Sequence, residues 1–309
     1  MVISDELAKD YLARVVLLTL PGLGIAMGTW GFLWDVFLLF AVFIVGCRKG
    51  TLTAAIFMAG GYILSLVVFG GTALSYLGFV PLAGLLGVFG WRRGWPVRVN
   101  FFWSAVLAAV LGAAPMFAFA VQGLDSGTAS TLINSTIQQY QASGLLEMMK
   151  EQGINEVEIR GLLQQGIHIY TLVVPSIAAL LAIIEFGFVF YFIRRWFKAE
   201  RIAFTRWRLP WYAVWGAVLG IACYLAGDQF AWQLVRGLGI NLMVIYGALT
   251  LVLGLSAYLY FLQSPRIPRL LKWALILTNF IYFLFSFISL IVFGLFDLVL
   301  NFRRLPEEL

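Results

Sequence analysis

The chain has 309 residues, of which 62% are hydrophobic and only 12% are charged, whereas a soluble globular protein is about half apolar and about a quarter charged. The mean hydropathy is +0.93. This composition excludes a water-soluble enzyme, a disordered chain and a disulfide-stabilised secreted domain. It predicts an all-α protein that crosses the bilayer many times. The net charge of +6 lies mainly in short loops between apolar segments, so we expect no nucleic-acid partner.

Apolar runs of roughly 20 residues match the thickness of a hydrocarbon core of about 30 Å. Eight or nine membrane-spanning helices are therefore predicted, which makes the fold a polytopic helical bundle. The expected spans lie near residues 11–29, 31–46, 51–69, 73–90, 100–122, 169–193, 210–227, 238–262 and 271–296. The last apolar run continues to about residue 302, and a break near Gly294 would turn its end along the membrane surface.

Lysine and arginine predict the orientation, because they favour the cytoplasmic loops of membrane proteins. The loops assigned to the cytoplasm contain Arg48, Lys49, Arg92, Arg93, Arg98, Arg194, Arg195, Lys198, Arg201, Arg206, Arg208, Arg266, Arg269 and Lys272. The opposite loops hold only Lys150, Arg160 and Arg236. We therefore expect a multi-pass protein of the bacterial inner membrane with a cytoplasmic N-terminus. Arg303 and Arg304 lie outside if the last run is one span, and inside if it is broken.

Residues 123–168 form the long connection between two spans, on the side opposite the basic loops. Asn155 followed by Glu158 resembles a capping box, and apolar residues then recur at helical spacing. Amphipathic helices are therefore predicted here. They either pack on the outer membrane face or form a lid over a cavity that opens outward.

Charged and polar side chains inside the spans are candidate substrate-binding residues, because burying a charge in the membrane costs about 2.5–3.5 kcal/mol. Glu185, within the sixth span, is the strongest candidate; Asp35 and Asn279 are weaker ones. The alternative is structural, with Glu185 hydrogen-bonded to another helix through a group such as Asn279. Asp297 is expected to cap a helix or to pair with Arg303 or Arg304.

Catalytic motifs are missing from the sequence. His168 is the single histidine, and the two cysteines, Cys47 and Cys223, fall on different apolar segments, so neither a metal centre nor a disulfide is predicted. No Gly-rich phosphate loop is present, so the chain is not itself an ATPase. Gly254-Leu255-Ser256 faintly resembles the turn that carries the nucleophile of serine hydrolases, but no histidine that could activate the serine lies near it in the membrane. We expect no enzyme activity and no cofactor.

Small and helix-breaking residues mark expected packing points. Gly24 with Gly28, and Gly216 with Gly220, are small-xxx-small pairs, and Gly22 extends the first of them. Such pairs let two helices approach closely, either within the chain or at a partner interface. Prolines within spans are expected to kink them. These are Pro21, Pro81, Pro115 and Pro175.

A series of short stretches resembles the YybS-like family of uncharacterised bacterial membrane proteins over most of the chain. The stretches are Arg48-Lys49-Gly50, Pro81 to Gly87 followed by Arg92-Arg93, Trp207-Arg-Leu-Pro-Trp211, Gly254-Leu-Ser, and Gly294-Leu-Phe-Asp297. The resemblance lies in their order, and it implies a membrane protein.

Residues 1–196 also resemble the substrate-binding (S) components of energy-coupling-factor vitamin transporters. That resemblance implies a six-helix bundle that binds a small molecule near the outer face, with a separate membrane coupling protein and ATPases as partners. In that family the first helix typically carries Ala-x-x-x-Ala, whereas this chain has Gly22, Gly24, Ala26 and Gly28. Residues 197–309 add two to three membrane helices beyond that plan.

Two classes of function follow. The leading one is a non-enzymatic substrate-binding or transport component for a small molecule, with a closed, polar-lined cavity beneath residues 123–168. The alternative is a membrane scaffold or regulatory subunit that binds other envelope proteins and transports nothing, with a filled core and an exposed apolar or glycine-rich face. The expected partners are the lipid bilayer, a membrane coupling subunit and a small-molecule ligand.

Overall fold

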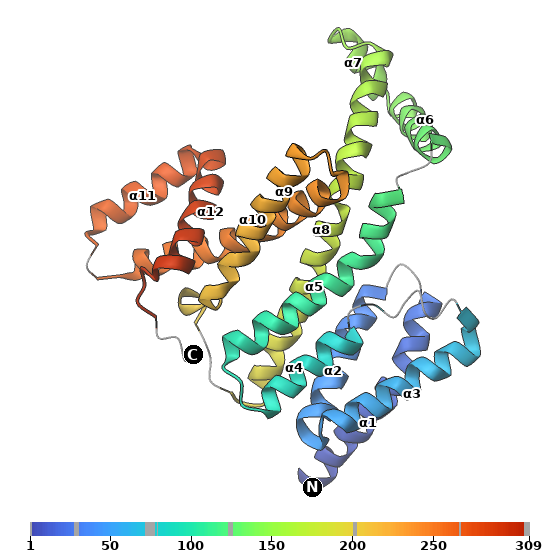
Figure 1. Cartoon of the computed structure of the whole chain (residues 1–309), viewed down its shortest axis with the longest axis vertical. Coiled ribbons are helices and arrows are strands. Elements are labelled where there is room, and N and C mark those ends of the chain that lie inside the picture. Colours follow the sequence, from blue (N-terminus) through green and yellow to red (C-terminus); the bar gives the residue numbers. More distant parts are fainter. Residues whose placement is uncertain are drawn as a thin grey trace.

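A computed structural model describes residues 2–27, 31–71, 78, 80–122, 126–199, 203–265 and 267–305. Within these ranges the regular structure is helical, which confirms the predicted all-α class (Figure 1). The helices are α1 (Val2–Met27), α2 (Gly31–Lys49), α3 (Thr51–Phe69), α4 (Val80–Arg92), α5 (Val97–Gln122), α6 (Ser126–Ala142), α7 (Leu145–Glu151), α8 (Glu156–Trp196), α9 (Val214–Gln229), α10 (Gln233–Gln263), α11 (Arg269–Ile281) and α12 (Phe283–Leu300). Two single 3-10 turns, η3 (Phe204–Arg206) and η4 (Trp211–Ala213), precede α9.

Four of the described helices have the length and hydropathy to cross a membrane. They contain the segments Thr51–Phe69, Val97–Phe117, Glu156–Trp196 and Gln233–Gln263, and Phe285–Leu300 is a shorter apolar helix. Each of them overlaps an expected span, and α1 and α2 coincide with the first two. Part of the expected span at 73–90 lies outside the described residues. The chain is thus a multi-pass membrane protein.

The last apolar run is broken at Tyr282, so the predicted break near Gly294 is wrong. Tyr282 has φ −102° and ψ 49°, outside the helical region. Gly294 lies inside α12, where a Cβ atom would overlap the carbonyl oxygen of Thr250 on α10. Gly254 of α10 meets the backbone of Leu290 in the same way. These glycines therefore allow α10 and α12 to pack closely. A glycine that interrupts a helix and a glycine that allows close packing look the same in the sequence.

Helices α11 and α12 form a hairpin beside α10 (Figure 1). With 13 residues, α11 is about 20 Å long at 1.5 Å per residue, too short for the hydrocarbon core. The chain thus changes direction at Tyr282, and we expect residue 305 to lie on the same side of the membrane as the start of α11.

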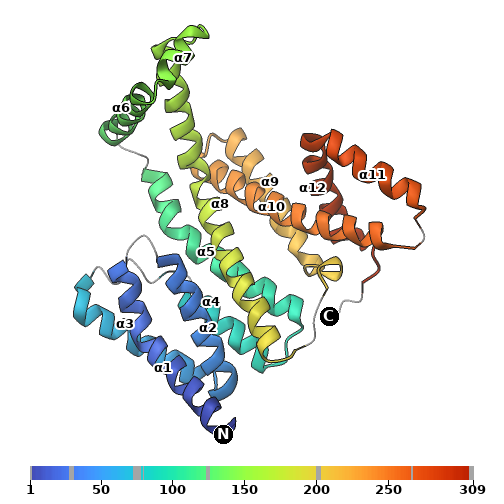
Figure 2. The same ribbon diagram turned by 180° about the vertical axis from the view of Figure 1, so that it is seen from behind.

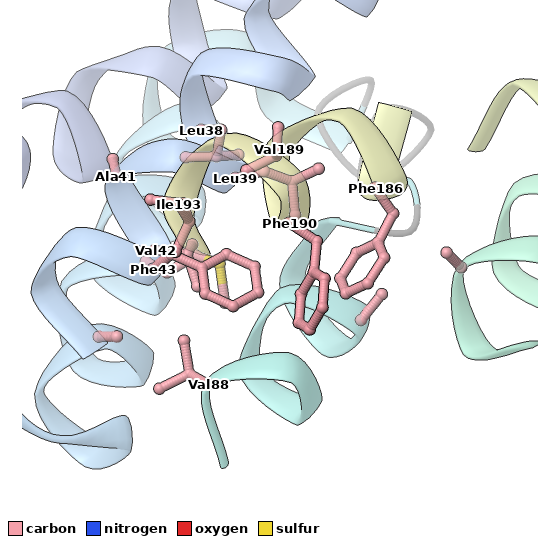
Figure 3. Close-up of a cluster of buried hydrophobic side chains, with 14 of the residues drawn as sticks. Leu38, Leu39, Ala41, Val42, Phe43, Val88, Phe186, Val189, Phe190 and Ile193 are labelled. Carbon is pink, nitrogen blue, oxygen red and sulfur yellow. The ribbon is translucent and has the colours of Figure 1, made fainter. Parts of the chain in front are cut away.

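The largest core cluster joins α1–α5 and α8, and Figure 3 shows the part of it around Phe43, Phe186 and Phe190. Phe43 and Phe186 are fully buried, and their ring centroids lie 6.1 Å apart. Phe190 stacks on Phe186 at 5.8 Å. Gly87 of α4 faces Phe43 and Phe186 at distances that leave no room for a side chain, so the rings pack directly against the α4 backbone.

A second, smaller cluster joins the C-terminal helices to α5. It consists of Phe102, Leu209, Ala213, Leu253 and Leu298. The proposed division into 1–196 and 197–309 follows these two clusters in part, but Ile245 and Leu249 of α10 also pack against the first cluster. The division therefore remains a prediction.

The described part of the long connection, residues 126–168, forms a small helical unit that includes the start of α8. The predicted capping box is present: the Asn155 Oδ1 accepts from the Glu158 amide at 2.8 Å, and Glu158 accepts from the Asn155 amide at 3.0 Å. Ile137, Leu146 and Ile159 form its core. Figures 1 and 2 both show α6 and α7 projecting beyond the other helices. The unit thus does not form a lid across the bundle, and its packing on the outer membrane face remains a prediction.

Pro175 lies within α8, and a side chain from α10 compensates for the break in its hydrogen bonding. The Asn241 Oδ1 accepts from the Ser176 amide at 2.8 Å, and its Nδ2 donates to the Leu172 carbonyl at 2.9 Å. Asn241 therefore bridges two groups that would bond each other in a regular helix. Pro21 and Pro115 also lie inside helices. Pro81, however, is the second residue of α4, where proline is tolerated.

Candidate ligand cavity at the basic end of the bundle

The helix ends that the charge pattern assigns to one side meet in the structure. Arg48 and Lys49, at the end of α2, pair with the Asp10 carboxylate at 3.0 and 3.3 Å. Arg92, at the end of α4, donates to the Cys47 carbonyl at 3.2 Å. The ends of α2 and α4 and the start of α1 therefore share one face, which agrees with the relative sidedness predicted from the loops.

A cavity of about 640 Å³ lies at this end, between the first turns of α5, the last turns of α8 and the segment that follows α8. Its lining residues are Val97, Arg98, Phe101, Gly187, Phe190, Tyr191, Arg194, Arg195, Ala199, Ala203, Phe204, Trp207 and Val252. Among the described residues the walls are thus largely aromatic and aliphatic, with three arginines as the charged members.

The walls of the cavity are fixed by packing between α4, α5 and α8. Asn100, which is 2% exposed, donates to the Gly87 carbonyl at 3.0 Å and holds α5 against α4. The Phe101 ring lies 5.7 Å from both the Phe190 ring and the Trp207 ring. Gly187 keeps part of the cavity open, since a Cβ atom there would already lie 3.5 Å from the Phe101 ring.

The C-terminal tail holds the segment after α8 in place. Arg303, 3% exposed, pairs with Asp297 at 2.7 Å, which confirms the predicted pairing. Its guanidinium also donates to the carbonyls of Thr205 at 2.8 Å and Trp207 at 2.9 Å, and to the Ser256 hydroxyl at 2.7 Å. The Ser256 hydroxyl in turn bonds backbone carbonyls of this segment. The tail therefore fixes the cavity wall that contains Trp207.

Cysteine labelling tests the resulting topology. With Cys47 and Cys223, both free thiols, replaced by alanine, we expect Lys150→Cys to react with an impermeant maleimide in intact spheroplasts. Arg206→Cys and Arg304→Cys should react only after permeabilisation, because Arg303 joins the tail to the 205–207 segment. The cysteine-free chain is the control. Labelling of residue 304 together with residue 150 would contradict the returning hairpin, and full reversal would contradict the orientation.

The sequence-predicted polar residues Asp35, Glu185 and Asn279 are not among the residues that line the cavity. Asp35 lies on α2, which packs against both α3, the helix of Tyr62, and α8, the helix of Glu185, and its charge acts on both of these side chains. Asn279 is not among them: it donates to the Tyr258 hydroxyl at 3.1 Å. The expected Glu185–Asn279 hydrogen bond is wrong because α11 packs on α12 rather than on α8.

The predicted packing glycines lie at helix contacts within the chain. Gly216 and Gly220 face Tyr246 and Leu242 of α10. On α1, Gly22 faces Ser65 of α3 and Gly24 faces Trp34 of α2, while Gly28 lies outside the described residues. Each of these glycines that the structure describes therefore contacts a neighbouring helix of the same chain.

The cavity was not predicted from the sequence. Its arginines were assigned to topology, and the only local signal was the density of aromatic residues around Arg98, Arg194 and Arg195. That these residues surround one space depends on the start of α5 lying beside the end of α8. Among the described residues there is no cluster of three or more His, Cys, Asp or Glu side chains that could hold a metal ion.

The apolar spans, the all-helical bundle and the basic end together define a multi-pass integral membrane protein. The chain matches the family described as "Predicted membrane protein (DUF2232)" over residues 15–298, and it belongs to that family. No curated protein and no solved structure matches the chain.

Proposed function

We propose that the protein is a non-enzymatic component of a bacterial inner-membrane transport system that binds a small molecule in the cavity at its basic end. The observation that carries the proposal is the cavity itself. Its volume of about 640 Å³ falls within the roughly 300–1,000 Å³ of ligand pockets, which are mostly apolar with a few polar groups that orient the ligand. The walls and the three arginines fit that description.

The relationship to S-components and to the YybS-like family is part of this proposal. In its support, α1–α5 and α8 share one core cluster, as expected for a six-helix unit. The position of the site differs from the S-component expectation, because the cavity lies at the basic end rather than beneath residues 123–168. Substrate exchange would then occur on the cytoplasmic side, where a coupling subunit can act.

The scaffold function has one observation in its favour. The unit formed by α6, α7 and the start of α8 projects from the bundle and has its own core of Ile137, Leu146 and Ile159. A projecting unit of this kind suits the binding of another envelope protein. Under the transport proposal, replacing residues 126–151 with a short linker leaves ligand retention intact; under the scaffold alternative, it removes a partner and no ligand is found.

Filling the cavity tests the transport proposal. In native mass spectrometry of the gently purified chain we expect a bound small molecule, and we expect Gly187→Phe to lose it because the new ring occupies the space beside Phe101. Gly161→Phe is the matched control, since a side chain at Gly161 of the same helix meets open space. Equal occupancy in the two variants, or an empty wild-type protein, would contradict the proposal.

A further inference from the structure

We propose that the cavity binds an uncharged molecule that carries an aromatic ring system. This inference rests on the proposed function, because it specifies the class of molecule that the cavity takes. The three arginines that line the cavity already interact with the protein or with water. The aromatic and aliphatic walls therefore determine what the cavity holds.

The lining arginines do not require an anion from a ligand. The Arg194 guanidinium lies 5.6 Å from the centre of the Trp91 ring, which is not among the lining residues. Arg98 is 5% exposed and also interacts with another group of the protein. Arg195 is exposed, so water solvates its charge. A negatively charged ligand would therefore leave water without gaining an unengaged cation among the described buried residues, which is unfavourable.

Apolar side chains from four parts of the chain form the walls. They are Val97 and Phe101 of α5, Phe190 and Tyr191 of α8, Ala199, Ala203, Phe204 and Trp207 of the segment after α8, and Val252 of α10. An apolar molecule that covers these surfaces releases the water in contact with them. A polar solute would lose its hydrogen bonds to water and would not replace them along these walls. The walls therefore select an apolar ligand.

The aromatic part of the walls favours a ring over an acyl chain. The centre of the Phe101 ring lies 5.7 Å from those of Phe190 and Trp207, and the ring planes are inclined by 54° and 75°. Inclined aromatic pairs attract one another beyond the burial of their area. A ligand ring gains the same attraction from the lining rings, whereas an acyl chain gains burial alone.

Protection of a cysteine in the cavity wall tests the inference. In the full-length chain with Cys47 and Cys223 replaced by alanine, Ala203→Cys places a thiol at an exposed lining position, where a maleimide reaches it in detergent solution. The probes are the uncharged N-phenyl-1-naphthylamine, 8-anilinonaphthalene-1-sulfonate, which adds a sulfonate to the same rings, and dioctanoyl phosphatidylcholine, which supplies acyl chains. We expect the uncharged probe to halve the labelling rate at a concentration about tenfold or more below that of either other probe.

Control substitutions separate the cavity from the detergent micelle. Arg206→Cys places the thiol at an exposed position in η3 that does not line the cavity, and no probe should change its labelling rate. In the Ala203→Cys chain, Phe204→Leu removes one lining ring and is expected to weaken the uncharged probe about twofold to tenfold, the effect of one aromatic contact. Phe188→Leu is the matched control, because Phe188 does not line the cavity. Phe204 and Phe188 are 45% and 50% exposed, so both variants are expected to fold.

Each remaining outcome decides against one claim. If the sulfonate probe protects residue 203 as well as the uncharged probe does, the cavity takes anions; if the short-chain lipid does so, the cavity takes acyl chains. Equal loss in Phe204→Leu and Phe188→Leu, or equal protection of residue 206, would overturn the aromatic site. If Gly187→Phe loses a co-purified molecule but the uncharged probe does not protect residue 203, only this inference fails. If the wild-type protein carries no molecule and no probe protects residue 203, the proposed function fails as well.

Discussion

Replacing Arg303 with leucine is expected to lower the free energy of unfolding by about 3–5 kcal/mol, the cost of leaving one member of a buried ion pair without its partner. The Asp297 carboxylate is 1% exposed and would lose both hydrogen bonds that Arg303 donates to it. The carbonyls of Thr205 and Trp207 would lose their donor at the same time. Unfolding in mixed detergent micelles, followed by circular dichroism, measures the change.

An exposed ion pair in the same chain provides the control. Arg236 and Asp228 lie 3.5 Å apart, with side chains 46% and 59% exposed, so Asp228→Asn should change stability by less than about 1 kcal/mol. Arg303→Lys should fall between the wild type and the leucine variant, because an ammonium group lacks the planar fork that reaches several acceptors at once. If Arg303→Leu lowers the free energy of unfolding no more than Asp228→Asn does, the stabilising role of the buried Arg303–Asp297 ion pair is contradicted.

The second large effect is expected for Asn241→Leu, at about 2–4 kcal/mol of destabilisation. The substitution leaves the Ser176 amide and the Leu172 carbonyl without the partner that Asn241 supplies, and each buried unsatisfied group costs about 1–3 kcal/mol. The same unfolding assay measures it. The loss should be smaller in a Pro175→Ala background, where α8 can close its own hydrogen bond between residues 176 and 172.

That double substitution is the decisive comparison. Two sites that act through one shared interaction show a coupling energy, whereas independent sites add. If Asn241→Leu costs as much in the Pro175→Ala background as in the wild-type chain, then Asn241 stabilises α10 for another reason and does not compensate for the proline. If the stability losses of the two single substitutions simply add, Asn241 does not compensate for Pro175, even if Asn241→Leu alone is strongly destabilising.

Local features of the sequence predicted the local features of the structure. The apolar runs predicted the helices that could span a membrane, and the capping box predicted the start of α8. Asp297, in the last turn of α12, and Arg303, just beyond the helix, are six residues apart, which allowed their pairing. Each of these depends on residues close together in the chain, where helix geometry fixes their neighbours.

Features that depend on which helices are neighbours were not predictable from one sequence. Asn279 bonds Tyr258 instead of Glu185 because α11 packs at the edge of the bundle, and no periodicity encodes that position. The role of Asn241 could not be predicted from the sequence, since its partners lie on α8. The arginines of the cavity were correctly placed at one end of the bundle, but their convergence depends on how α5 and α8 pack.

The length of α8 has a mechanical consequence. Its 41 residues extend for about 60 Å at 1.5 Å per residue, roughly twice the thickness of the hydrocarbon core. One end carries the α6–α7 unit, the other carries Arg194 and Arg195, and Pro175 lies near the midpoint. A single helix therefore joins the α6–α7 unit to the cavity, and the point at which its own hydrogen bonding is interrupted, near Pro175, is the point at which α10 supports it through Asn241.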